Sequence, residues 1–296
     1  MEIRDSRIDS GKAFDWGRTS EDYARFRDIY PEVFYQKIAD RGLCISGQNV
    51  LDIGTGTGVL PRNMFHYGAK WTGTDISPEQ IQQAERLSAE AGMDIDYRTG
   101  AAEMLDFPDH SFDIVTACQC FFYFDHEKLM PVLARILKED GRLVLLYLVW
   151  LPSEDMIAGK SEEIVLKYSP DWTGAGYQRY PIGIPDAVSD YFELEDHEEY
   201  DVAVPFTRES WHGRMRACRG VGASLSDHEL LQWEKEHRKM LEEYAPERFE
   251  VLHYASLAVL KRSRQTAGRQ PNSVICLISS APQEGKIWPG ADEIIT

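Results

Sequence analysis

Short apolar runs alternate with helical stretches between residues 49 and 150, and this alternation restricts the fold more than any other feature of the sequence. The apolar runs cover 49–53, 70–74, 112–118 and 142–150, and helix-like patterns fill 59–67, 78–91 and 126–137. Strands separated by helices of this length are typical of βαβ units, which build a parallel sheet. The stretch 143–151 is almost continuously apolar, so we expect a central strand covered on both faces.

The residues before this region predict helices. Tyr23, Phe26, Ile29 and Tyr30 recur at helical spacing before Pro31, and a second helical stretch is expected over 32–40.

Beyond Pro152 the pattern is mixed. Helices are expected over 153–168, 208–219 and 227–244, and strands over 191–204 and 249–260. The charged, alternating stretch 191–204 is typical of an edge strand. Residues 263–296 lose periodicity, and we expect a weakly ordered tail or an accessory arm there.

The most informative motif is Val50-Leu51-Asp52-Ile53-Gly54-Thr55-Gly56-Thr57-Gly58, in which a strand leads into three alternating glycines and then a helix. Glycine allows a ligand to approach the backbone closely, and a helix N-terminus offers free N–H donors. A dinucleotide fingerprint would need a small residue where Val59 stands, and no Gly-Lys-Ser/Thr of a P-loop is present. Because Asp52 suits a cation better than a phosphate, we expect a ligand with an ammonium or sulfonium group.

Two further segments follow in a fixed order. The next strand ends at Asp75, where a carboxylate can accept hydrogen bonds from ribose hydroxyls. The third strand leads to Gly100-Ala101-Ala102-Glu103. Together with the glycine loop, these segments resemble the class I S-adenosylmethionine-dependent methyltransferases, specifically the small-molecule group that includes ubiquinone/menaquinone and trans-aconitate methyltransferases. The resemblance covers residues 20–150 well and 190–262 only in general pattern.

This resemblance implies a fold and a cofactor. The fold is α/β, a three-layer Rossmann-like methyltransferase fold with a seven-stranded, mostly parallel sheet and one antiparallel strand, plus a helical lid and an insertion. The cofactor is S-adenosylmethionine. The expected divisions of the chain are a helical lid at 1–46, a cofactor-binding core at 47–152, an insertion at 153–190, the C-terminal part of the core with acceptor-covering helices at 191–262, and the tail at 263–296.

The resemblance also implies site residues. Those expected to bind the cofactor are Tyr23, Asp52, Gly54, Thr55, Gly56, Gly58, Asp75, Ile76, Gln80, Ala102, Glu103 and Gln119. Asp52 is expected near the amino group, Asp75 on the ribose and Ile76 on the adenine. Ala102 and Glu103 are expected at the adenine edge, Gln119 beside the methyl group and Tyr23 in the lid. The competing interpretation is that Asp75 and Glu103 are ordinary surface carboxylates at strand ends.

Candidates for the acceptor site come from three places. Tyr123 follows the fourth predicted strand, and it is a catalytic candidate together with Arg214. Arg18 belongs to the lid segment. The stretch 208–219 holds four arginines beside Trp211, with His212, Arg216 and Arg219 on one predicted helix face. Trp211, Arg214, Arg216 and Arg18 are therefore candidates for binding the acceptor, with a guanidinium gripping an anion such as a carboxylate. The competing interpretation is a solvated face that pairs with local acids.

Charge and cysteine content exclude several classes of partner. The formal net charge is −17, which disfavours nucleic acids and anionic membranes as partners. Five scattered cysteines give no metal-ligand spacing, so reduced thiols and no metal site are expected. The longest apolar run is far too short for a membrane helix, and the N-terminal residues lack the apolar stretch of a secretory signal. These features favour a cytoplasmic protein.

The predicted function is methyl transfer from S-adenosylmethionine to a small-molecule acceptor by in-line displacement, with a carboxylate-bearing acceptor as one candidate. One alternative is a non-catalytic S-adenosylmethionine-binding sensor or interaction module. A nicotinamide-dependent oxidoreductase is a second alternative, and Val59 counts against it. The sequence leaves open the acceptor atom, the use of a general base and the oligomeric state.

Overall fold

The computed structural model describes residues 2–263, so the predicted tail lies almost entirely outside the described residues. Its seven strands are β1 (Asn49–Ile53), β2 (Lys70–Asp75), β3 (Asp96–Thr99), β4 (Phe112–Cys118), β5 (Leu137–Trp150), β6 (Phe192–Thr207) and β7 (Arg248–Arg262). They form one sheet in the order β3-β2-β1-β4-β5-β7-β6. β1 to β5 pair in parallel, and β7 runs antiparallel to both β5 and β6. The predicted fold class, including the single antiparallel strand, is confirmed.

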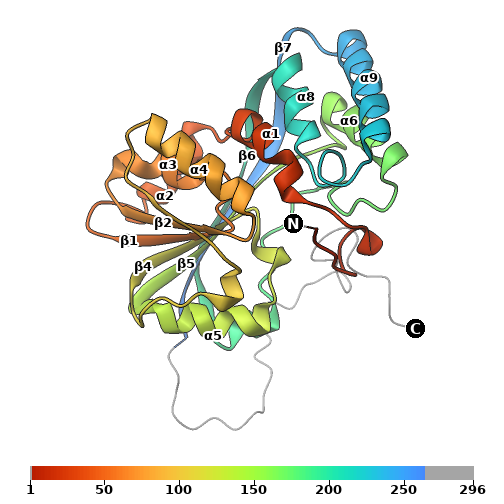
Figure 1. Cartoon of the computed structure of the whole chain (residues 1–296). Helices are drawn as coiled ribbons and strands as arrows, with labels where there is room; N and C mark the ends of the chain where they lie inside the picture. Colours follow the sequence, from red (N-terminus) through yellow and green to blue (C-terminus); the bar gives the residue numbers. More distant parts are fainter. Residues whose placement is uncertain (1, 264–296) are drawn as a thin grey trace, which may run out of the picture.

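Helices cover both faces of this sheet. The helices are α1 (Ser20–Phe26), α2 (Glu32–Ala39), α3 (Val59–Met64), α4 (Pro78–Glu90), α5 (His126–Ile136), α6 (Met156–Tyr168), α7 (Asp186–Ser189), α8 (Arg208–Arg216) and α9 (Asp227–Tyr244). Figure 1 shows α2, α3 and α4 on one side of the sheet and α5 on the other. Helices α6, α8 and α9 form a second group beside the long strands β6 and β7 (Figure 1). None of the helices within residues 2–263 is long and apolar enough to span a bilayer.

The burial of β5 explains its continuous apolarity. Val144, Leu146 and Leu148 belong to the core under α2, α3, α6, α8 and α9, whereas Leu143 and Leu145 belong to the core under α5. Successive side chains of a strand point to opposite faces, so a strand between two helical layers must be apolar at every position. The two cores therefore produce the three-layer arrangement that the sequence predicts.

Two predicted elements differ in the structure. Helix α1 ends at Phe26, so Ile29 and Tyr30 lie beyond it and pack against the core instead. Proline disfavours helical backbone in the residue before it, which prevents a continuous helix up to Pro31. Strand β5 begins at Leu137, earlier than predicted, because its pairing with β4 shifts register between Phe112 and Ile114 and accommodates the polar residues 138–141.

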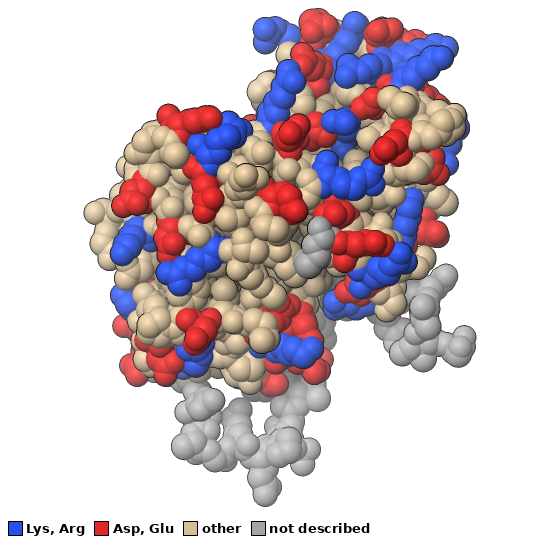
Figure 2. Space-filling model, viewed as in Figure 1, with Lys and Arg blue, Asp and Glu red and all other residues tan. Residues whose placement is uncertain are grey.

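The N-terminal segment joins the two groups of helices. Helix α1 contacts both α4, which packs on the sheet, and α8, which belongs to the second group. Arg25 pairs with Glu209 of α8, and the Gln80 side chain of α4 donates to the Trp16 carbonyl. Acidic and basic side chains are intermixed on the face shown in Figure 2. The described residues also form exposed or partly exposed ion pairs, such as Arg86 with Glu90 and Arg179 with Glu154. This surface supports solubility and adds little stability.

Candidate functional site

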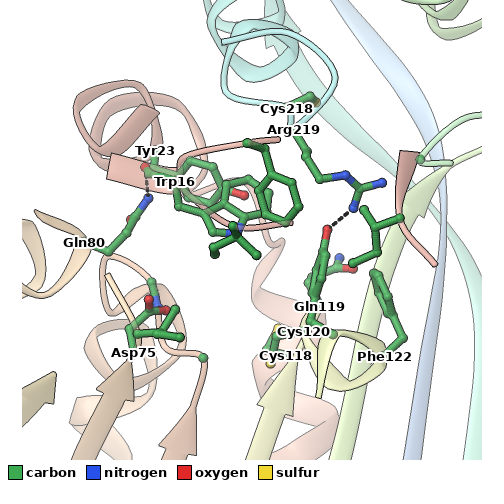
Figure 3. Close-up of a pocket in the computed structure, with 18 of the residues that line it drawn as sticks. Trp16, Tyr23, Asp75, Gln80, Cys118, Gln119, Cys120, Phe122, Cys218 and Arg219 are labelled. Carbon is green, nitrogen blue, oxygen red and sulfur yellow. Dashed lines mark hydrogen bonds between the residues drawn. The ribbon is translucent and has the colours of Figure 1, made fainter. Parts of the chain in front are cut away.

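A cavity of about 290 Å³ lies at the carboxyl ends of the parallel strands. Its floor comes from the loops after β1, β2, β3 and β4 and from the end of β5. The N-terminal segment, including Phe14, Trp16 and Tyr23, closes one side, and residues 172–177 and 214–219 close the other. Figure 3 shows Asp75 and Gln80 on one side of this space and Gln119, Phe122 and Arg219 on the other. In open α/β sheets, ligands bind at this edge.

The glycine loop forms part of the floor. Gly54 and Gly56 line the cavity, whereas Thr55 is buried and does not line it. A Cβ atom on Gly54, which has φ 63°, would lie 2.8 Å from the Cys120 sulfur, so only glycine fits between the loop and β4. Gly58 does not line the cavity either; it begins α3 and packs on Tyr97.

Asp75 lies at the end of β2 and faces the cavity. Its Oδ2 accepts the Gly56 N–H at 2.9 Å, and its Oδ1 accepts the Ser77 N–H at 2.9 Å. Burial raises the pKa of this carboxyl, against the lowering effect of the backbone donors. Each oxygen keeps a lone pair, so the carboxylate can accept two further hydrogen bonds from a diol. Ile76, which follows, lies 41% exposed at the rim.

Asp52 lies behind the loop rather than in the cavity. Its side chain is 2% exposed and accepts a hydrogen bond of 2.6 Å from Thr116, and it is not among the lining residues. Burial raises the pKa of Asp52 to about 7. The geometry gives Asp52 a place beneath the glycine loop, without direct access to the cavity.

Gln80 presents an unsatisfied acceptor to the site. Its Nε2 donates to the Trp16 carbonyl at 3.2 Å, and the side chain is 2% exposed. Its Oε1 is buried without a hydrogen-bond partner among the described residues and lies 3.8 Å from a Cβ built on Gly56. Buried polar atoms in native proteins are nearly always paired, so this oxygen indicates a ligand with a donor group beside Gly56.

The end of β4 holds Gln119 in an unusual conformation. Its φ is 67°, in the left-handed region that non-glycine residues rarely adopt. Its backbone N–H donates to Leu146 and its side-chain Nε2 donates to the Leu148 carbonyl, so both ends are fixed against β5. Such strain is concentrated at functional sites, and Gln119 lines the cavity.

Glu103 and Ala102 complete the floor beyond Asp75. Both line the cavity, and Ala102 is buried. The Glu103 Oε1 accepts the Asp125 N–H at 2.9 Å, which ties the loop after β3 to the start of α5. Glu103 therefore has a structural contact in addition to its place at the cavity.

Aromatic rings of the N-terminal segment cover the site. Trp16 makes edge contacts with Tyr23 and Tyr123, with ring centroids 5.7 Å and 6.0 Å apart. The Arg27 guanidinium lies 4.6 Å from the centroid of the Tyr23 ring. Burial raises the pKa of Tyr23. The predicted lid residue Tyr23 thus lines the cavity together with Arg27.

Of the predicted acceptor-binding residues, only Arg214 and Tyr123 reach the cavity. Arg214 is 4% exposed, lies 4.8 Å from the Trp150 ring centroid and donates to the Cys218 sulfur at 3.2 Å. Its Nε has no partner, and no carboxylate within residues 2–263 forms an ion pair with it. Desolvation and the nearby Arg27 lower the pKa of Arg214. A buried guanidinium without an anion is costly, and it points to an anionic ligand.

The other three candidates lie elsewhere. Arg18 pairs with the exposed Asp227, and Arg216 pairs with Asp22 and Glu234. Trp211 is fully buried in the core and donates to the Ser161 hydroxyl.

The predicted helix face of His212, Arg216 and Arg219 is wrong. Helix α8 ends at Arg216, so Arg219 lies in the following turn and reaches toward the N-terminal segment. His212 is buried and contacts His237 of α9.

Several residues that line the cavity were not predicted from the sequence. Trp150, Trp172 and Phe14 form much of the wall around Arg214 and Arg219. They come from three distant segments, and no local pattern marks them as neighbours. In the described part of the chain, no group of three His, Cys, Asp or Glu side chains could hold a metal ion.

Comparison with known proteins gives a consistent family. Residues 51–145 match the family described as "Methyltransferase domain". An uncharacterized methyltransferase, YcgJ of Bacillus subtilis, is 36% identical over 104 residues, which cover 34% of this chain and 41% of that protein. A ubiquinone biosynthesis O-methyltransferase of Xanthomonas euvesicatoria is 32% identical over 131 residues, covering 44% of this chain and 55% of the relative. The chain thus spans about half the length of these curated relatives.

A solved structure of YcgJ from Bacillus subtilis aligns with 79% of this chain and 100% of its own, at 20% identity and a TM-score of 0.48. The sequence match lies over the strands that carry the glycine loop, Asp75 and Gln119. Residues 51–145 therefore match a methyltransferase domain, and this match supports S-adenosylmethionine as the cofactor.

Proposed function

We propose that the chain transfers the methyl group of S-adenosylmethionine to a small-molecule acceptor, by in-line displacement, and releases S-adenosylhomocysteine. The observation that carries this proposal is a single cavity whose two ends are lined by different kinds of side chain. Asp75, Gln80 and the glycine loop equip one end for a nucleoside, and Tyr123 and Arg214 face the other.

The residues at the first end fit the cofactor. Asp75 has free lone pairs for the ribose hydroxyls, and Ile76 with Ala102 offers apolar surface for the adenine. The unpartnered Oε1 of Gln80 suits a donor group of the ligand. Gly54 and Gly56 leave backbone exposed to the amino-acid portion, and Gln119 lies next to them at the end of β4. Asp52 contributes through the loop that it supports.

The cofactor supplies an electrophilic methyl group, so the protein needs to hold the acceptor in line and keep water away. Trp16, Tyr23 and Phe14 cover the cavity and exclude water. Burial raises the pKa of Tyr123 to about 12, so its phenol stays protonated at neutral pH. Tyr123 is therefore suited to donate a hydrogen bond to the acceptor and not to remove a proton from it.

We also propose that the acceptor carries an anionic group, such as a carboxylate, which Arg214 binds. Both Arg27 and Arg214 line the cavity, and neither forms an ion pair within the described residues. The carboxylate of the cofactor can neutralise one of them, and Arg27 lies beside Tyr23 in the lid. The second guanidinium then requires another anion. A carboxylate acceptor would need no general base, which agrees with the high pKa of Tyr123.

Two experiments test this function. Calorimetric titration should show binding of S-adenosylhomocysteine and none of NAD, and the opposite result would overturn the assignment. An assay with tritiated methyl groups, using carboxylate-containing metabolites and their neutral amides, should label the carboxylates only. Arg214→Ala should raise the apparent KM for the labelled acceptor, whereas Arg238→Ala, an exposed arginine of α9, should leave it unchanged. Cofactor binding without any methyl transfer would favour the sensor alternative.

A further inference from the structure

A buried ion pair joins the N-terminal segment to the turn after α8. The Arg219 Nε donates to the Asp9 Oδ2 at 2.7 Å, and its Nη2 donates to the Asp9 Oδ1 at 2.8 Å. The two side chains are only 4% and 5% exposed. This is a bidentate contact between residues 210 positions apart in the sequence.

Thr173 completes the hydrogen bonding of this pair. Its backbone N–H and its hydroxyl both donate to the Asp9 Oδ1, at 2.7 Å and 2.9 Å. The Thr173 hydroxyl oxygen also accepts from the Arg219 Nη2 at 2.7 Å. The insertion between β5 and β6 is therefore tied to the same carboxylate as the N-terminal segment.

The third edge of the Arg219 guanidinium reaches the cavity. Its Nη1 donates to the Tyr123 phenol oxygen. Arg219 and Tyr123 both line the cavity, and Figure 3 shows the guanidinium at its edge beside Gln119 and Phe122. Because the phenol oxygen accepts from Arg219, the phenol proton is directed elsewhere. Tyr123 lines the cavity, so its O–H can donate to a molecule bound there.

Stability alone does not explain this arrangement. Replacing a buried ion pair by apolar residues is often neutral or stabilising, because both charges must be removed from water. Asp9 and the following Ser10 also have φ of 48° and 52°, a left-handed conformation that non-glycine residues rarely adopt. The chain therefore maintains a costly contact and a strained turn next to Ile8 and Arg219, which line the cavity, a combination typical of functional sites.

We propose that Asp9 is a positioning residue for methyl transfer, which holds Arg219 so that Arg219 orients the Tyr123 phenol as a hydrogen-bond donor to the acceptor. The contact chain stands by itself, and only the role of Tyr123 as a donor rests on the proposed function. The N-terminal segment is then a part of the acceptor site and does more than cover the cofactor. The charged and titratable groups facing Tyr123 are Arg219, Asp9, Tyr23, Tyr177 and Arg27.

The first test follows the Tyr123 phenol directly. The protein is labelled with tyrosine carrying ¹³C at Cζ, saturated with S-adenosylhomocysteine, and titrated to pH 12, close to the pKa of Tyr123, with Tyr123→Phe used to assign the resonance. Asp9→Asn releases Arg219 from the position in which it donates to the Tyr123 oxygen, so Tyr123 should ionise at higher pH than in the wild type. Arg219→Gln removes the positive charge, so Tyr123 should ionise at higher pH than in the wild type.

A shift to higher pH in both variants supports the proposal, because loss of the Asp9 charge alone would shift Tyr123 to lower pH. An unchanged Tyr123 resonance in Asp9→Asn, or a shift to lower pH, would overturn it. If Asp9→Asn does not fold, Thr173→Val removes the bridging hydroxyl while keeping both charges, and it should still perturb the Tyr123 resonance. An unperturbed resonance there would count against the contact chain.

The second test measures turnover and binding separately. Asp9→Asn should lower kcat for the labelled acceptor about tenfold or more, since small displacements of a positioning group are costly. The dissociation constant of S-adenosylhomocysteine should change less than twofold. Asp227→Asn, which breaks the exposed pair between α9 and Arg18, is the control and should alter neither quantity. A loss of cofactor affinity without a loss of kcat would contradict the positioning role. If the wild type transfers no methyl group, the proposed function fails and the resonance test still decides the contact chain.

Discussion

The Asp75 carboxylate accepts the Gly56 N–H at 2.9 Å, so the end of β2 and the glycine loop after β1 form one edge of the cavity. The second oxygen accepts the Ser77 N–H and thereby also fixes the turn that leads into α4. Asp75 is thus oriented before any ligand arrives. A preorganised acceptor loses little entropy on binding, which favours tight recognition of a diol.

Substituting Asp75 should therefore weaken cofactor binding. Asp75→Asn replaces one accepting oxygen of the carboxylate by an NH2 group, which can only donate and would lie next to a backbone N–H donor. We expect S-adenosylhomocysteine to bind about 10- to 100-fold more weakly, the range for losing hydrogen bonds to a charged group. Isothermal titration calorimetry measures the change. Asp96→Asn removes a partly exposed carboxylate from β3 and should bind as the wild type does. Equal affinity in both variants would refute a ribose contact by Asp75.

Two glycines with positive φ allow the effect of backbone strain on stability to be distinguished from the effect of steric overlap. Gly58 has φ 73°, and a Cβ there would lie 2.2 Å from the Tyr97 hydroxyl; Gly92 has φ 67° with no atom within 4 Å. Gly92→Ala should lower the free energy of unfolding by about 1–2 kcal/mol through backbone strain alone. Gly58→Ala should lose about 1–3 kcal/mol more through overpacking. Urea denaturation of the two variants tests this difference, and Tyr97→Phe should partly rescue Gly58→Ala.

The sheet could be predicted because its signals are local. A buried parallel strand is apolar at each position, and the turns that follow carry Gly54 and Asp75 at their strand ends. The helix predicted over 78–91 corresponds to α4, and Ser77 caps its N-terminus by accepting the Gln80 N–H. The residues that line the nucleoside end of the cavity follow from these turns, since parallel strands bring their carboxyl ends to one edge.

The acceptor end could not be predicted in the same way. Arg214 and Arg219 belong to one arginine-rich stretch. Arg214 faces the cavity without an ion-pair partner among residues 2–263, whereas Arg219 pairs with Asp9. Arg216 turns away to Asp22. An arginine of this stretch forms an ion pair only where the fold brings a carboxylate to it from a segment some 200 positions away. Neither periodicity nor spacing in the sequence indicates such contacts. The same holds for Asp52. Its place in the sequence, just before the glycine loop, does not reveal that its carboxylate accepts a hydrogen bond from Thr116 behind the loop.

Glu162 should make stability depend on pH. Its carboxylate accepts from Trp150 Nε1 at 2.5 Å and from Gly176 N–H at 2.8 Å, and burial raises its pKa to about 7. The folded state thus holds a proton that the unfolded state has lost, so this contribution is complete below pH 4.5 and is lost as pH rises through 7. Relative to Glu162→Gln, the wild type should lose about 3 kcal/mol between pH 4.5 and 7.5. The exposed neighbour Glu163→Gln should show no such trend in urea denaturation.

Two buried histidines should make the protein less stable as pH falls, which is opposite to the effect of Glu162. The Ser161 hydroxyl donates to the Ile157 carbonyl, so its oxygen accepts from the His237 Nε2. His237 Nδ1 then accepts from His212 Nδ1 at 2.9 Å, which requires the His237 ring to be neutral. Burial lowers the pKa of His212 to about 3 and that of His237 well below its usual value.

Acidification should therefore destabilise the contact between α8 and α9. Below pH 6.5 the unfolded chain binds protons that the folded histidines cannot, so stability is lost as pH falls. His212 should cost about 2 kcal/mol between pH 6.5 and 5, and His237 acts in the same direction. His212→Phe keeps a ring stacked on Trp233 and should be less stable than the wild type at pH 7.5, with a smaller difference at pH 5. His228→Phe, at an exposed site at the start of α9, should keep the wild-type pH dependence. A constant difference between His212→Phe and the wild type in urea denaturation at both pH values would show that the buried pair does not titrate with unfolding.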